Sequence, residues 1–220
     1  MKTHYYLGWF SNFIPEDLAR VLQEDITDRK LIVMISSNPD IYGEVGATER
    51  SWLDAAGITF EEYHLINYQV EKGDAQALIQ KASVIFLLGG NPVKQNEFLM
   101  DYELSEPIKQ SKAVVMGASA GAINMSAKWL CSKKLGFEAE TSSLLNGVGL
   151  DDFSVLSHYD LENNTDLVLS ELSPLSKDMV IYASNKDCAI WVKGAQIDIY
   201  GNVYVISNSV IRKLDTTLNL

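Results

Sequence analysis

The sequence is poor in the residues from which disulfide frameworks and metal centres are built. Its 220 residues include two cysteines and three histidines. Cys131 and Cys188 fall in segments that read as a helix and a strand, where a free cysteine usually acts as a small buried hydrophobe. We therefore expect neither a disulfide nor a metal site, and no cofactor.

Positive charge is also scarce. Eighteen Lys and Arg residues stand against 29 Asp and Glu residues, which gives a formal net charge of −11 at pH 7. Nucleic acids and anionic membranes attract basic surfaces, so this balance argues against both as partners. An acidic surface is a common route to solubility and needs no catalytic interpretation.

Long hydrophobic runs are missing as well. No stretch approaches the roughly 18 consecutive apolar residues of a membrane span, and the N-terminal MKTHYYLGWF lacks the apolar core of a signal peptide. The length suits one sizeable hydrophobic core. We expect a cytoplasmic protein, monomer or homodimer, with a single α/β domain over residues 1–220.

The most informative stretch is AVVMGASAGAINMSA, at residues 113–127. Its first four residues are apolar and partly β-branched, which predicts a strand buried on both faces. GASAG follows, and then Ile123, Ala127 and Cys131 recur at helical spacing. Strand, tight turn and helix put Ser119 on a nucleophile elbow, with the N–H of Ala120 as an oxyanion donor.

A second apolar strand, SVIFLLGG at residues 83–90, ends in two glycines followed by Asn91 and Pro92. This cluster is typical of a turn into a helix, with Asn91 as the cap and Pro92 in the first turn. It also leaves backbone N–H groups at the edge where open α/β sheets bind ligands. The two interpretations are compatible.

A serine nucleophile needs a base, and the three histidines are His4, His64 and His158. His4 and His64 lie inside early strand-like segments, where a structural role is the default. His158 stands near the end of the strand-like FSVLSHY, from which it would reach the sheet edge that holds Ser119. We therefore predict that His158 is the general base.

The first half of the chain alternates strands with helices, and this order predicts a doubly wound, mostly parallel sheet flanked by helices. The expected strands before SVIFLLGG lie at residues 3–9, 31–37 and 58–66. The helix after Ser119 is expected to extend past Cys131 to a cap at Gly136, and residues 137–149 to form a loop.

The last third of the chain reads as a series of short strands. They are expected at residues 179–184, 188–193, 196–200 and 203–207. Gly201-Asn202, between the last two, is a two-residue hairpin signal. We expect these strands to extend one edge of the sheet in antiparallel order.

Several of these segments together resemble peptidase family S51, the serine peptidases that include dipeptidase E and cyanophycinase. They are GASAGAINMS around Ser119, LLGGN at residues 87–91, SHYD at residues 157–160, and the later CAIWVKG and IDIYGNVYVI. The resemblance implies a fold like that of the class I glutamine amidotransferases. It also implies that Ser119 is the nucleophile, His158 the base, and the N–H groups of Gly90 and Ala120 the oxyanion donors.

The third member of the catalytic triad is an acid that the family supplies from the segment between nucleophile and histidine. In that segment we predict Glu138, with Glu140 as an alternative. Asp160, two residues after His158, is a further alternative, as is a Ser-His pair without a carboxylate. A cation for an acidic substrate would have to come from residues such as Lys177 or Lys186.

The leading functional hypothesis is a serine peptidase of the dipeptidase E type, which cleaves a small peptide or amide through an acyl-enzyme. An α/β-hydrolase-like esterase also uses the G-x-S-x-G pattern, but it places its histidine later in the chain and carries an HGGG-like stretch. A non-catalytic small-molecule-binding module on the same scaffold is the third hypothesis, because fold alone does not determine function.

Overall fold

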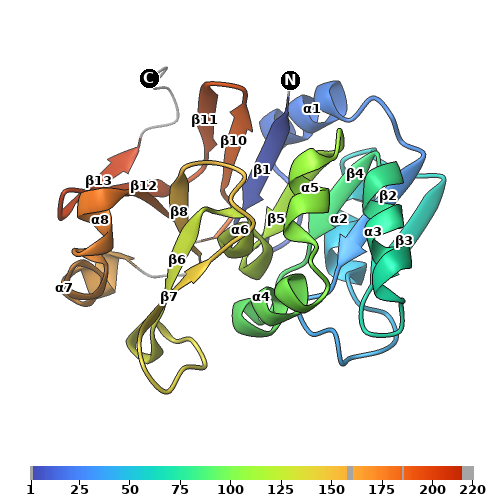
Figure 1. Cartoon of the computed structure of the whole chain (residues 1–220). Coiled ribbons are helices and arrows are strands. Elements are labelled where there is room, and N and C mark those ends of the chain that lie inside the picture. The colour runs from blue at the N-terminus through green and yellow to red at the C-terminus, as the bar shows by residue number, and fades with distance from the viewer. Residues whose placement is uncertain (1, 158–160, 185, 215–220) are drawn as a thin grey trace.

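The computed structural model describes residues 2–157, 161–184 and 186–214. A seven-stranded sheet lies at its centre (Figure 1). In spatial order its strands are β11 (Gln196–Tyr200), β10 (Ala189–Lys193), β1 (Thr3–Leu7), β5 (Val114–Ala118), β4 (Val84–Leu87), β2 (Leu31–Ile35) and β3 (Glu62–Ile66). The last five are parallel to one another, whereas β10 and β11 are antiparallel additions at one edge. This architecture confirms the predicted mostly parallel α/β fold.

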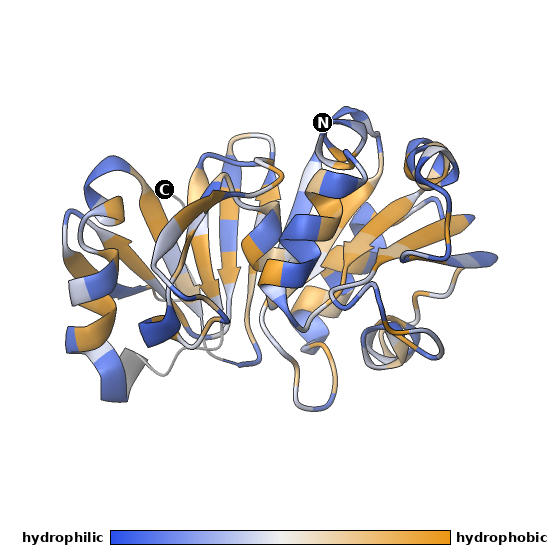
Figure 2. Ribbon diagram, turned by 60° about the horizontal axis from the view of Figure 1, so that its bottom comes forward, coloured by the Kyte–Doolittle hydropathy of each residue, from blue (hydrophilic) through white to orange (hydrophobic). Residues whose placement is uncertain are grey.

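Helices cover both faces of the seven-stranded sheet. One face carries α1 (Glu16–Asp25) and α2 (Ala47–Ala55); the other carries α3 (Lys72–Lys81), α4 (Pro92–Asp101), α5 (Ser105–Gln110) and α6 (Ala120–Met125). The strand LIVMI explains why two layers are needed: Val33 and Ile35 enter one hydrophobic core, and Ile32 and Met34 enter the other. Successive side chains of a strand point to opposite faces, so a wholly apolar strand must be covered twice. In Figure 2 the strands are largely hydrophobic and lie between helices with hydrophilic outer faces.

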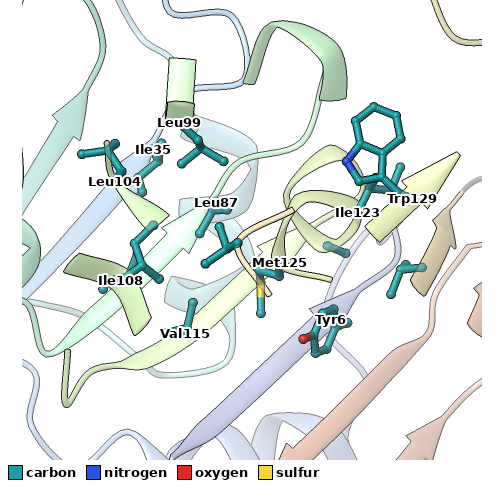
Figure 3. Close-up of a cluster of buried hydrophobic side chains, with 14 of the residues drawn as sticks. Tyr6, Ile35, Leu87, Leu99, Leu104, Ile108, Val115, Ile123, Met125 and Trp129 are labelled. Carbon is teal, nitrogen blue, oxygen red and sulfur yellow. The ribbon is translucent and has the colours of Figure 1, made fainter. Parts of the chain in front are cut away.

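The core on the α6 side joins the elbow region to the sheet. Figure 3 shows Ile123 and Met125 of α6 beside Leu87 of β4, Val115 of β5 and Tyr6 of β1. All five side chains are buried. The helix after Ser119 is thus packed by its apolar side chains on the strands that end near it.

A second sheet of four strands was not predicted. It contains β13 (Val210–Leu214), β12 (Val203–Ser207), β9 (Val180–Ser184) and β8 (Phe153–Ser157), in that order. β10 and β11 extend the large sheet as expected, but β9 and β12 do not. The two inner strands β9 and β12 are buried on both faces: Tyr182 and Val205 enter the core on the α6 side, whereas Ile181 and Ile206 pack with α7 (Leu161–Leu172) and α8 (Leu175–Asp178).

The expected hairpin at Gly201-Asn202 is wrong for the same reason. β11 before it belongs to the large sheet and β12 after it to the small one, so the turn carries the chain between sheets. Gly201 has φ 75°, and a Cβ there would overlap the carbonyl oxygen of Asp187. The tight hairpin lies instead at Asn208 and Ser209, which have φ values of 49° and 63° and connect β12 to β13.

The expected long helix after Ser119 is also wrong. α6 ends at Met125, where the Ser126 hydroxyl donates to the Ile123 carbonyl at 2.6 Å. Residues 128–131 form β6 (Lys128–Cys131), which pairs with β7 (Ser143–Asn146) inside the expected loop. A short 3₁₀ turn (Lys133–Leu135) follows β6 and ends at Gly136, which is left-handed as its predicted capping role requires.

In the described part of the chain, no helix is long and apolar enough to cross a membrane.

Candidate active site

Ser119 lies in the turn between β5 and α6. Its backbone has φ 50° and ψ −107°, a conformation that residues other than glycine rarely adopt. The Ser119 N–H donates to the Leu7 carbonyl at 3.0 Å, and its own carbonyl accepts from the Ile123 N–H at 3.0 Å. Hydrogen bonds from β1 and α6 therefore hold a strained residue in place, as in a nucleophile elbow.

Both glycines of the GASAG stretch are required by close packing. A Cβ on Gly121 would overlap the carbonyl oxygen of Leu87, and one on Gly117 would lie 2.5 Å from the carbonyl carbon of Gly121. The turn therefore packs backbone against backbone on the end of β4. Ala120 is the first residue of α6, so its N–H has no acceptor one turn earlier in the helix, and its role as an oxyanion donor stays a prediction.

The Gly89-Gly90-Asn91 turn follows β4, whose Leu87 pairs with Gly117 of β5. Gly90 is exposed, with φ 135°. Asn91 caps α4, because its side-chain oxygen accepts from the N–H groups of Val93 at 3.0 Å and Lys94 at 3.1 Å. The capping interpretation is therefore confirmed, and it leaves Gly90 at the carboxyl edge of the sheet, one strand away from Ser119.

Glu138 reaches the same turn. Its side chain is exposed, and its carboxylate accepts a hydrogen bond from the Asn91 amide at 3.0 Å. Glu140 is exposed as well. His158 and Asp160 lie outside the described residues, so the role of Glu138 behind His158 stays a prediction.

β8 is the last described strand before His158 in the sequence, and a series of contacts connects the end of β8 to the strand that binds the Ser119 N–H. Ser157, its last residue, is opposite Ser184 of β9, and the Ser184 hydroxyl contacts the Cys188 thiol. The Cys188 carbonyl accepts from the Gly8 N–H at 2.8 Å. Gly8 follows Leu7, the residue that binds the Ser119 N–H, so the ends of β8, β1 and β5 are linked by adjacent contacts.

The other two histidines are placed away from Ser119. His4 is buried in β1, and its Nδ1 lies 2.8 Å from the Asp151 carboxylate, which also accepts from the Tyr6 hydroxyl at 2.6 Å. His64 lies on the edge strand β3 beside Glu62. Both match the structural role expected from the sequence. Among the described residues, no group of three or more His, Cys, Asp or Glu side chains is arranged to hold a metal.

A buried amide network that sequence reasoning missed ties α6 to the Gly89-Gly90-Asn91 turn. Asn124 of α6 donates to the carbonyl of Pro92 at 2.9 Å and to the Gln95 side chain at 3.1 Å. Gln95 in turn donates to the Leu88 carbonyl at 3.0 Å, and Asn96 donates to Asn124 at 2.9 Å. Because fully paired buried amides resist displacement, the network fixes the elbow relative to the turn.

Two further side chains contact Gly89, and neither was singled out from the sequence. Glu49 of α2 is only 4% exposed, and its carboxylate accepts from the Gly89 N–H at 3.0 Å. The buried hydroxyl of Ser37, in the turn after β2, donates to the Gly89 carbonyl. Ser37 follows an apolar strand at the carboxyl edge, which was a usable signal; a glutamate inside a helix carried none.

Fold and site together define an α/β protein with a serine elbow and a glycine-rich turn at the carboxyl edge of a parallel sheet. The model of peptidase family S51 matches residues 20–200, and the chain belongs to this family. A cyanophycinase from Geminocystis herdmanii is 27% identical over 169 residues, which cover 73% of this chain and 58% of that protein. The chain thus spans less than two thirds of this relative.

Two solved structures show the same fold. A peptidase from an acI-B1 Actinobacterium has a TM-score of 0.69 at 17% identity, with 97% of this chain and 94% of that chain covered. A candidate peptidase E from Listeria monocytogenes has a TM-score of 0.64 at 17% identity, with 98% and 100% covered. At such identities the likeness concerns the fold.

Proposed function

We propose that the protein is a serine peptidase that hydrolyses a small peptide or amide bond through an acyl-enzyme. The observation that carries the proposal is the strained backbone of Ser119, held on the elbow beside the Gly89-Gly90 turn. Strain at a non-glycine residue is tolerated where the surroundings enforce it, and a nucleophile elbow is one such place. Membership of peptidase family S51 supports the same conclusion.

The proposed reaction proceeds in two halves. Ser119 Oγ bonds to the carbonyl carbon of the scissile amide while its proton passes to His158, and the carbonyl π electrons move to the oxygen. The N–H groups of Gly90 and Ala120 stabilise that oxyanion. The carbonyl then re-forms, the C–N bond breaks, and the leaving amine takes the proton from His158. Water repeats these steps on the ester, which releases the acid and restores Ser119.

Glu138 is proposed as the carboxylate that orients His158. What supports it is its hydrogen bond to Asn91, which keeps its carboxylate at the edge where Gly90 lies.

Two lysines are candidates to bind an acidic group of a substrate. The backbone of exposed Lys186 pairs with Trp9, whose ring lies against Gly89. Lys177 lies on α8, against the second sheet. Lys186 is therefore the better candidate to bind an acidic group of a substrate.

The test is a pair of serine substitutions, one directly after β5 and one at the end of α5, before that strand. Dipeptides with varied first residues, including aspartyl and β-aspartyl ones, identify a substrate. Ser119→Ala should then abolish its turnover and prevent labelling by a fluorophosphonate, with the fold retained. Ser111→Ala removes a buried hydroxyl before the same strand and should leave both intact.

Three results would overturn the proposal. Unchanged peptide turnover in Ser119→Ala would show that Ser119 is not the nucleophile. Hydrolysis of p-nitrophenyl esters without cleavage of any peptide would favour the esterase. A folded parent protein that the fluorophosphonate does not label at Ser119 would favour the binding module.

A further inference from the structure

The two peptide groups on either side of the Gly89 Cα are each held by a side chain from another part of the chain. The Gly89 carbonyl accepts a hydrogen bond from the Ser37 hydroxyl, and the Gly89 N–H donates to the Glu49 carboxylate at 3.0 Å. Ser37 must be the donor in the first contact, because a carbonyl oxygen can only accept. The turn is thus restrained at two consecutive peptide groups.

The restraint on the Gly89 carbonyl determines where the Gly90 N–H points. These two groups belong to one planar peptide unit, and the described part of the chain contains no cis peptide bond. In a trans peptide the C=O and N–H bonds point in opposite directions. The Ser37 hydroxyl, by holding the oxygen on its side, therefore directs the Gly90 N–H to the other side. Gly90 accommodates this contact because it has no side chain: a Cβ would overlap the Ser37 hydroxyl.

Glu49 is an unusual residue for its position on α2. It shares one face of the helix with Trp52 and Leu53, which are 1% and 0% exposed and belong to the hydrophobic core. Burial of a carboxyl group on such a face costs free energy unless hydrogen bonds compensate for the lost hydration. Burial also raises the pKa of Glu49, and the N–H groups of Gly89 and of Glu49 itself only partly oppose this. The Glu49 carboxylate binds the Gly89 N–H, at the start of the Gly89-Gly90 turn.

We propose that Ser37 and Glu49 are positioning residues, which orient the Gly90 N–H as an oxyanion donor. The inference rests on the proposed function, since it requires an oxyanion on a substrate bound to Ser119. Neither residue touches the reacting atoms; both act through the backbone of Gly89. Misdirection of one preorganised donor weakens stabilisation of the transition state without weakening substrate binding.

Three variants and one control test this role. Ser37→Ala and Glu49→Ala should each lower kcat by about ten- to a hundredfold and change KM by less than about twofold. Affinity for a peptide trifluoromethyl ketone, which forms an oxyanion on the serine, should fall in parallel with kcat. Glu49→Gln keeps an oxygen that can accept from Gly89 and should retain most of kcat. As the control, Ser36→Ala removes a buried hydroxyl that accepts from the Asn38 N–H, and its kcat should match that of the parent.

The outcomes separate this inference from the proposed function. If Ser119→Ala abolishes turnover but folded Ser37→Ala and Glu49→Ala keep the parent kcat, the positioning role is wrong and the peptidase stands. A rise in KM with kcat unchanged would also overturn it, because it would indicate a substrate-binding role. If Glu49→Ala does not fold, Ser37→Ala alone decides, since it removes a single hydroxyl. If Ser119→Ala retains turnover, both conclusions fail together.

Discussion

Asp25 and Glu49 have carboxyl side chains with almost no exposure. They lie at opposite ends of the parallel strands of the seven-stranded sheet. Asp25 ends α1 at the amino edge, where it accepts hydrogen bonds from Lys193 at 2.6 Å, Tyr5 at 2.6 Å and Trp191 at 2.7 Å. Glu49 lies beside the carboxyl edge and accepts from the Gly89 N–H. One carboxylate has a cation and two side-chain donors, whereas the described partners of the other are backbone N–H groups.

The difference appears in the pKa directions. Burial alone would raise the pKa of Asp25, but the hydrogen bonds from Lys193, Tyr5 and Trp191 together lower it below its ordinary value. Burial raises the pKa of Glu49, and backbone hydrogen bonds do not compensate. The comparison teaches that Asp25 is paired for stability, joining α1 to β1 and β10. Glu49 is buried at a cost in free energy, next to the turn that the proposed reaction needs.

The largest expected effect is on stability at the amino edge. Asp25→Ala leaves the Lys193 ammonium and two buried donors without their acceptor, and should lower the free energy of unfolding by about 3 kcal/mol. Lys193 is 41% exposed, so solvent limits the loss. Urea unfolding measures it, with kcat as the control. A loss below about 1 kcal/mol, or a fall in kcat of the folded variant, would remove the contrast between the two carboxyls.

Opposite pH dependences should follow from the two carboxyls. Asp25 has a folded pKa below its ordinary 3.8, so its contribution to stability is present above that value and is lost as pH falls through the folded pKa. Glu49 has a folded pKa above 4.5, so its contribution is present below that value and is lost as pH rises through the folded pKa. The test is to measure the unfolding free energies of the parent, Asp25→Asn and Glu49→Gln from pH 3 to pH 8. The difference between the parent and Asp25→Asn should grow as pH rises, whereas the difference between the parent and Glu49→Gln should shrink as pH rises. If both differences changed with pH in the same direction, the environment assigned to one of the two carboxyls would be wrong.

The smallest effect concerns the cysteines, which show what burial does with little polar compensation. Burial raises the pKa of the Cys188 thiol to about 11 and that of Cys131 above its usual range. Both thiols are free and buried, and thiolate is the reactive form. A disulfide reagent at pH 8 should therefore label neither cysteine in the native protein and both in urea. Rapid labelling of native Cys188 would show that the region between β9 and β10 opens readily.

Sequence reasoning recovered the features that depend on neighbouring residues. The strand LIVMI, the cap at Asn91 and the tight turn at Ser119 were predictable, because periodicity, capping chemistry and small residues act over a few positions. It failed after Met125, where a helical spacing of apolar residues continues into β6. There the pairing of β6 with β7 decided the structure.

The contacts of Ser37 and Glu49 with the Gly89-Gly90 turn could not be predicted, for a different reason. Ser37 and Glu49 are separated from Gly89 by 52 and 40 positions. Without a fold there is no reason to connect a serine after one strand and a glutamate within a helix to a glycine after another strand. Strand order brings β2 beside β4 and α2 over the same edge, and only then do these side chains meet the turn.

The sequence by itself determined the parallel α/β class, the serine at the elbow, and the glycine turn after a buried strand, because each is written in consecutive residues whose local chemistry allows few alternatives. That this turn lies one strand away from Ser119 was decided by the pairing of β4 with β5. The tertiary structure alone decided that the C-terminal strands divide between two sheets, and that Glu49 and Asp25 have opposite environments. Burial and pairing are properties of distant segments brought together, and a carboxylate has no assigned cost or role until its neighbours are in place.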